Sequence, residues 1–105
     1  MSTIIVKRGD TRPALTANLS TAAGPIDLTG ATVRFVMGNP GEAAVVNAAA
    51  TIVDAAAGTV RYSWLPADTD TAGMWRAEWE ITWPDGVQTV PADGYDLVRI
   101  VSDLG

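Results

Sequence analysis

Closely spaced carboxylates are the side chains of this 105-residue chain that could do chemistry. Glu78 and Glu80 lie two positions apart in a stretch that alternates polar and apolar residues, so a strand would place both carboxylates on one face, about 7 Å apart. A pair at that separation could serve in glycoside hydrolysis. A small domain made of strands offers no cleft beside such a face, however, and Arg61 and Arg76 are candidate cross-strand partners for the two charges. We therefore interpret the pair as part of a solvated or contacting face.

A second acidic motif, Asp68 to Gly73 (DTDTAG), resembles the first half of a calcium-binding loop. The third ligand is missing at Ala72, and Trp79 stands at the twelfth position, where glutamate completes such loops. Aspartates in short loops often accept hydrogen bonds from neighbouring backbone amides instead. We therefore predict a structural loop and no metal site.

The tripeptide Arg8-Gly9-Asp10 has the sequence of an integrin-binding motif. Motifs this short recur by chance in many proteins. Gly9 permits a tight bend and Asp10 can cap a turn, so we interpret the tripeptide as a turn that ends the first strand.

The chain contains no histidine and no cysteine. That composition excludes thiolate nucleophiles, disulfides, Ser-His-Asp catalysis and the usual zinc sites. Lys7 is the only lysine, and no glycine-rich phosphate loop is present. We therefore predict that the protein is not an enzyme and binds no cofactor and no metal.

The net charge of −5 argues against anionic partners. Basic residues cluster only at Lys7-Arg8, and an acidic surface repels phosphate backbones and anionic lipid, so we predict no nucleic-acid and no membrane partner. The N-terminal residues have neither a long apolar stretch nor a cleavage-like site, and no apolar run reaches the ~18 residues that a membrane helix needs. We expect synthesis in the cytoplasm without a signal peptide.

Four tryptophans could form a flat surface on which sugar rings stack, as in a carbohydrate-binding module. In the stretch 75–83 the three tryptophans alternate with polar residues and lie on the same strand face as Ala77 and Ile81. Large groups are needed to fill the domain, so we interpret the tryptophans as core or interface residues. Trp75 and Trp83, at strand ends, are expected to be partly exposed contact residues. The predicted core anchors are Phe35, Tyr62, Trp64, Trp79 and Tyr95.

Polar and apolar residues alternate with a period of two along much of the chain, which predicts strands. The clearest strand, Trp75 to Trp83, leads into Pro84-Asp85-Gly86, where we expect a three-residue hairpin loop with Gly86 in the left-handed conformation. The alanine content of residues 42–57 favours a helix, whereas the β-branched residues at 45–46 and 51–53 favour a strand or a bent pair over 45–53, which we prefer. The other predicted strands are residues 3–7, 14–19, 31–37, 59–64, 87–90 and 95–101.

Seven or eight short strands separated by turn residues are typical of an antiparallel, two-sheet β-sandwich of the immunoglobulin-like type. A chain of 105 residues without a linker predicts one domain over residues 1–105, and the absence of cysteine means that it has no disulfide. We expect the terminal strands, Thr3–Val6 and Leu97–Val101, to leave open sheet edges.

The turn and core residues together form an ordered set that resembles the N-terminal domain of phage baseplate upper proteins. The set comprises Gly9-Asp10-Thr11 with Pro13, Ile26–Val33 with Phe35, Gly58-x-Val60-x-Tyr62-x-Trp64, Asp68-Thr69 with Gly73, and Glu78, Asp85-Gly86, Pro91 and Tyr95. The resemblance runs from about Ile4 to Ile100. It implies an immunoglobulin-like β-sandwich that anchors a tail appendage in the virion through protein–protein contacts, without catalysis.

On this resemblance we expect a virion structural protein of the tail, baseplate or connector, which contacts other virion proteins and occurs in several copies or as a symmetric homo-oligomer. Family members continue into coiled-coil and receptor-binding regions, so receptor binding is not carried over to this chain. A capsid decoration protein and a carbohydrate-binding β-sandwich module are the alternatives. The candidate interface residues are Arg8, Asp10, Asp68, Asp70, Trp75 and Trp83.

Overall fold

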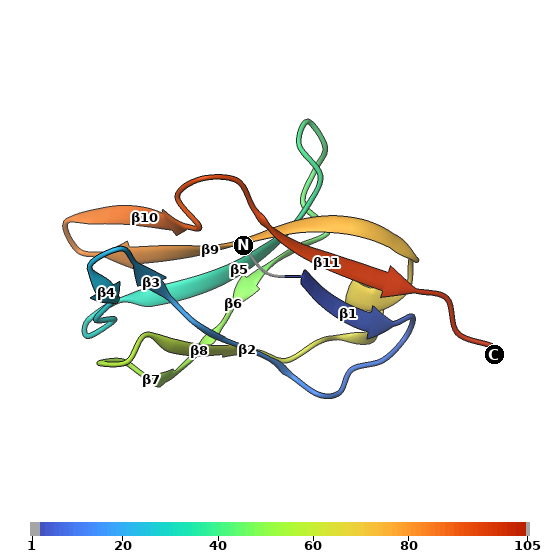
Figure 1. Ribbon diagram of the computed structural model, residues 1–105, viewed down its shortest axis with the longest axis horizontal. Coiled ribbons are helices and arrows are strands. Elements are labelled where there is room, and N and C mark those ends of the chain that lie inside the picture. The colour runs from blue at the N-terminus through green and yellow to red at the C-terminus, as the bar shows by residue number, and fades with distance from the viewer. Residues whose placement is uncertain (1–2, 105) are drawn as a thin grey trace.

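The computed structural model describes residues 3–104, which form short strands and a single turn of 3₁₀ helix, η1 (Pro66–Thr69). No helix in this part of the chain is long and apolar enough to cross a membrane. The strands are labelled in Figure 1 and are β1 (Thr3–Lys7), β2 (Leu15–Asn18), β3 (Ser20–Thr21), β4 (Gly24–Pro25), β5 (Thr32–Gly38), β6 (Val46–Ala49), β7 (Thr51–Asp54), β8 (Thr59–Tyr62), β9 (Gly73–Trp83), β10 (Gly86–Val90) and β11 (Asp96–Val101).

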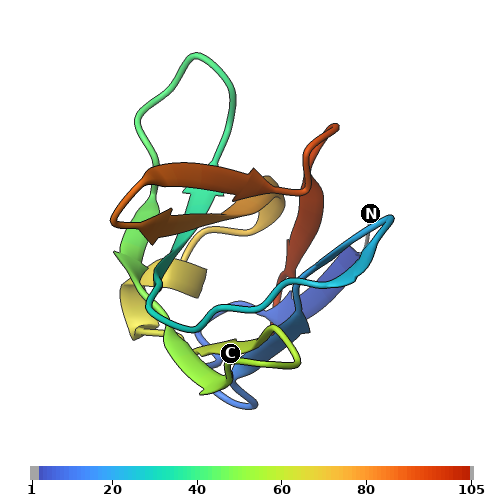
Figure 2. The same ribbon diagram turned by 90° about the vertical axis from the view of Figure 1, so that its left-hand side faces the viewer.

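Two sheets make up the body of the molecule. The larger has the strand order β1-β11-β9-β5-β6, and the smaller has the order β2-β8-β7. The long strand β9 pairs with β5 along one edge, and along the other edge it pairs with β11 at residues 73–77 and with β10 at residues 79–83. The chain passes from the larger sheet to the smaller at residues 8–14 and at Ala50, and it returns at residues 19–31 and 63–72. Figure 2 shows the strands arranged around a common interior.

The core lies between the two sheets, because the inward-facing positions of each strand are apolar. Phe35 of β5 stacks on Tyr62 of β8 with a ring-centroid distance of 4.9 Å, and it also meets Trp64 at 5.6 Å and Trp79 at 4.9 Å. All four of these side chains are at most 4% exposed. Since Phe35 and Trp79 come from the larger sheet and Tyr62 from the smaller, this aromatic cluster joins the two sheets.

The all-β, two-sheet architecture without a disulfide is confirmed, and two details of the topology differ from the prediction. β1 pairs with β11 in parallel, whereas we expected antiparallel sheets throughout. β11 therefore lies between β1 and β9, so its edges are both paired, and only β1 remains a terminal edge strand. The parallel pair joins the two ends of the chain, and such a long-range contact leaves no local trace in the sequence.

The ambiguous segment 42–57 contains a bent pair of strands, one in each sheet, with Ala50 between them. Residues 20–25, which lie outside the predicted strands, form the small hairpin of β3 and β4. The hairpin after β9 has a two-residue loop, because Gly86 pairs with Trp83. Our expectation of a left-handed Gly86 is wrong: Gly86 is not among the glycines with positive φ, since Pro84 and Asp85 alone make the turn.

Candidate docking surfaces

Two loops that are far apart in the sequence meet at one end of the sandwich. The N–H group of Gly9 donates a hydrogen bond to the carbonyl of Thr69 at 2.9 Å, and the Thr69 hydroxyl donates to the carbonyl of Asp10 at 2.9 Å. Thr69 is fully buried, which fixes the segment after η1 against the first loop. We call this end of the molecule, residues 8–13, 65–75 and 102–104, the loop end; it lies on the right in Figure 1.

Arg8 ties the C-terminal residues to the loop end. Its Nε and Nη2 atoms donate to one carboxylate oxygen of Asp103 at 3.1 and 3.0 Å. Both side chains are partly exposed, so the pair contributes little to the stability of the fold, on the order of 0–1 kcal/mol. Its main effect is to hold residues 102–104 beside the first loop.

Asp68 is a structural residue, although the sequence made it a candidate for the interface. One carboxylate oxygen accepts hydrogen bonds from the Tyr62 hydroxyl at 2.6 Å and from the Leu65 amide at 2.8 Å. Burial raises the pKa of Tyr62, and the hydrogen bond and negative charge of Asp68 act in the same direction. Among residues 3–104 no group of acidic side chains could hold a metal ion.

The remaining candidates at the loop end are more accessible. Asp10 and Asp70 are exposed, and Asp70 accepts a hydrogen bond from the Thr71 hydroxyl at 3.0 Å. Trp75 is half-buried, and its indole N–H donates to the carbonyl of Thr71 at 3.3 Å. The structure thus gathers Arg8, Asp10, Asp70 and Trp75 at one end.

Trp83 lies at the opposite end of β9, eight residues and about 26 Å of strand from Trp75. It is half-buried beside the hairpin loop. It cannot belong to the same contact as the loop-end candidates. Trp64 and Trp79 are buried, so neither can contribute to a sugar-stacking row.

Exposed apolar side chains at the loop end were not predicted from the sequence. Leu65 is 60% exposed and Met74 is 48% exposed. The exposure of Met74 could have been predicted, because alternation along β9 directs its side chain outward when that of Trp75 points inward. Leu65 follows an alternating strand and precedes a proline, and no local pattern marks it as exposed. Leu65 and Met74 are exposed apolar groups among polar residues, a composition that is common in protein–protein contacts. Trp75, the next residue of β9, points to the opposite face of the sheet from Met74 and packs against the core.

The outer face of the larger sheet has polar contacts that differ from the expected ones. Arg61 lies on β8 of the smaller sheet and cannot pair with Glu78 or Glu80. Arg76 donates to the side-chain oxygen of Asn39 at 3.1 Å, not to a carboxylate. Within residues 3–104 neither glutamate forms an ion pair, and both are half-buried.

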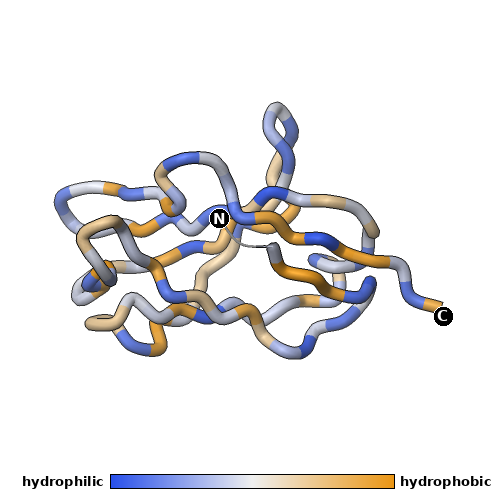
Figure 3. Tube along the Cα trace, viewed as in Figure 1, coloured by the Kyte–Doolittle hydropathy of each residue, from blue (hydrophilic) through white to orange (hydrophobic). Residues whose placement is uncertain are grey.

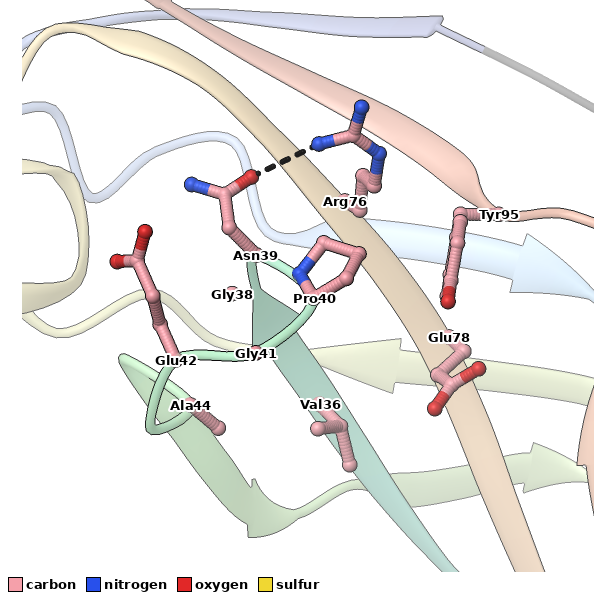
Figure 4. Close-up of a pocket in the computed structure, with 10 residues that line it drawn as sticks. All are labelled: Val36, Gly38, Asn39, Pro40, Gly41, Glu42, Ala44, Arg76, Glu78 and Tyr95. Carbon is pink, nitrogen blue, oxygen red and sulfur yellow. Dashed lines mark hydrogen bonds between the residues drawn. The ribbon is translucent and has the colours of Figure 1, made fainter.

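A pocket of about 190 Å³ opens on this outer face, between β9 and the projecting loop 39–45. Figure 4 shows Arg76 and Glu78 on its floor, with Asn39 and Pro40 on one side and Tyr95 on the other. Tyr95 was predicted as a core anchor, and that prediction is wrong: it is half-buried and lines this pocket. The side chains of Val98 and Ile100 face inward on β11, so alternation directs the odd-numbered positions outward, and Tyr95 is one of them.

Comparisons with known proteins agree on one type of domain. Residues 2–91 match the family model described as the BppU N-terminal domain. Among solved structures, the N-terminal domain of phage TP901-1 ORF48 matches with a TM-score of 0.67 and 14% sequence identity, over 97% of this chain and 85% of that chain. At this identity the structural match concerns the fold. No curated protein sequence gives a significant match.

Proposed function

Because the chain belongs to the family of BppU N-terminal domains, a family of phage baseplate domains, we propose that it is a non-catalytic docking module of a phage tail baseplate. In this proposal it resides in the virion and is held to other virion proteins through its loop end. The observation that carries the proposal is the loop end itself, where Thr69 is hydrogen-bonded to the loop 8–13 and the apolar side chains of Leu65 and Met74 are exposed. A rigid end with exposed apolar groups is suited to a permanent contact.

The chemistry of the chain supports the same proposal. Histidine and cysteine are absent, and the Asp68 carboxylate of the loop end is used in internal hydrogen bonds. A domain of this kind acts through the surface that it presents. We propose that several copies of the chain occupy equivalent positions in the particle, each burying at least ~800 Å² against its partner.

Mass spectrometry of washed particles tests the proposal directly. We expect the chain to sediment with tails at a fixed stoichiometry. Met74→Asp at the loop end should reduce incorporation by about tenfold or more, because it replaces an exposed apolar group of the proposed contact with a charge. Val53→Asp is the matched control, since Val53 is 52% exposed, close to the 48% of Met74, and lies away from the loop end.

Two results would contradict the proposal. Finding the chain in capsids but not in tails would make it a capsid decoration protein. Its absence from particles, with binding of the isolated chain to a glycan array, would favour a carbohydrate-binding module.

A further inference from the structure

Each of the two sheets has an unpaired edge strand on the same side of the molecule. β1 pairs only with β11, and β2 pairs only with β8. The loop 8–14 connects β1 to β2, so the two strands run in opposite directions beside each other without forming a ladder. The edge strands β6 and β7, by contrast, follow each other directly in the chain and are joined through Ala50.

A long groove with both apolar and polar walls lies between β1 and β2. It consists of two adjoining hollows of about 450 and 480 Å³, which share Ile4, Leu15 and Thr16 in their walls. Trp79 and Phe35 reach the first hollow from the core, and Trp64 reaches the second. We call this feature the β1–β2 groove.

The backbone of both strands has hydrogen-bonding groups directed to the groove side. The N–H group of Arg8 donates to Val101 on the β11 side, so strand alternation directs the N–H and carbonyl of Ile5 to the free edge of β1. The N–H group of Leu19 donates to Gly58 on the β8 side, which by the same alternation directs Thr16 and Asn18 to the free edge of β2. The Ile5 side chain is 63% exposed as well.

Charges at one end of the groove indicate what could enter it. Lys7, Asp10 and Arg12 line this end, and neither Lys7 nor Arg12 forms an ion pair within residues 3–104. The excess of one positive charge favours an acidic group on the incoming segment. The strand Thr3–Lys7 of a second copy has no acidic residue and would add another lysine, so a second copy is the poorer match.

We propose that an extended segment of a partner virion protein adds to the free edge of β1 as a further strand and covers the β1–β2 groove. Its alternate apolar side chains enter the groove toward Leu15, Trp64 and Trp79, and an acidic side chain meets Lys7 and Arg12. Only an extended backbone can satisfy a row of unpaired N–H and carbonyl groups, which is why the occupant is a strand. This inference rests on the proposed docking function and adds a contact along β1 to the one at the loop end.

Hydrogen exchange of the chain in purified tails, compared with the isolated chain, tests the proposal. Strand addition to β1 should slow exchange of the Ile5 and Lys7 amides by at least about tenfold, with the largest effect at Ile5. The amides of β10, at the far end of β9, serve as the internal reference. A chain that is present in tails but exchanges at Ile5 as fast as the isolated protein would overturn this inference and leave the docking function intact.

Two variants provide an independent measurement. Ile5→Lys places a charge on the free edge and should reduce incorporation into tails by about tenfold or more. Val87→Lys is the matched control, because Val87 is also 63% exposed and lies on β10. Ala17→Phe, which fills the groove, should act like Ile5→Lys, and melting curves of all three variants establish that they fold.

The remaining outcomes also decide the question. Protection of Ile5 that appears in the concentrated isolated chain would assign the edge to a second copy and contradict the proposal. Absence of the chain from tails would contradict both this inference and the docking function.

Discussion

The carboxylate of Asp68 shows how a motif that resembles a metal site serves the fold instead. One of its oxygens accepts hydrogen bonds from the Tyr62 hydroxyl and from the Leu65 amide, so the side chain joins the end of β8 to the first turn of η1. Tyr62 in turn stacks on Phe35 in the core. Asp68 therefore links the core, through Tyr62, to the loop end.

This hydrogen bond gives the protein a pH dependence in the alkaline range. Burial and Asp68 raise the pKa of Tyr62 above its ordinary value of 10.0, so the folded state keeps the phenol proton where the unfolded state loses it. The resulting stability is fully present below pH 10 and decreases as the pH rises beyond it. We expect Tyr62→Phe to be less stable than wild type at pH 7, by about 1–3 kcal/mol. Its free energy of unfolding should also fall less steeply above pH 10.

Denaturant midpoints of wild type and Tyr62→Phe between pH 7 and pH 11 measure this difference. The gap in unfolding free energy between the two proteins should narrow above pH 10. Tyr95→Phe, which changes a half-buried tyrosine outside the core, is the control. Parallel profiles for wild type and Tyr62→Phe would show that the phenol of Tyr62 is not held protonated by the fold.

Individual core residues could be predicted from the sequence where alternation is long. Trp79 and Phe35 lie in the middle of strands with several alternating positions on each side, so their inward direction was evident. Tyr95 precedes its strand, and the inward parity of Val98 and Ile100 excludes it from the core. The partners of Arg76 and Arg34 could not be predicted, because Asn39 and Asn47 reach them through a cross-strand register that the sequence does not encode locally.

Elements were predictable to the extent that their signal is local. Period-two alternation located the strands, and β6 and β7 were found despite their alanines because β-branched residues mark both. The hairpin of β3 and β4 has only two residues in each strand, too few to alternate. The β1–β11 pair and the groove beside β1 depend on contacts between residues far apart in the sequence. The alternation of polar and apolar residues within a strand does not show which other strand it pairs with.

The turn between β7 and β8 depends on Gly58. This residue has a φ of +71°, and its carbonyl accepts a hydrogen bond from the Leu19 amide at 2.8 Å. A Cβ atom at this position would lie 2.5 Å from the carbonyl oxygen of Leu19 and 2.9 Å from that of Ile26. Glycine is therefore required both for the backbone conformation and for the close approach of two other chain segments.

We expect Gly58→Ala to destabilise the domain by about 3–5 kcal/mol, because backbone atoms cannot move aside as a flexible side chain does. Gly30→Ala is the matched control: Gly30 has a φ of +78°, and a Cβ atom there would meet nothing within 4 Å. Gly30→Ala should destabilise the domain only by the strain of an alanine in the left-handed conformation, about 1–2 kcal/mol. Equal losses for the two variants in urea unfolding would contradict the close contact at Gly58.

At the scale of the whole molecule, the two sheets depend on one shared core. Phe35 of the larger sheet contacts Tyr62 of the smaller sheet and Trp64 directly after it, and neither sheet has a second apolar face that could be buried alone. The chain also crosses between the two sheets four times. Separate unfolding of either sheet would expose most of the apolar surface that the other buries.

The domain should therefore unfold in a single transition that both sheets share. For 105 residues we expect a calorimetric enthalpy of about 70 kcal/mol near the midpoint, equal to the van't Hoff enthalpy. Val60→Ala in β8 and Val98→Ala in β11 make the same chemical change at fully buried positions of the two sheets, and each should cost about 1.5–3 kcal/mol. Both variants should shift the same transition downward by several degrees and keep the two enthalpies equal. If Val60→Ala instead split the transition, so that β9 and its neighbours melted separately from β8, the smaller sheet would be an independent unit and the shared core would not govern stability.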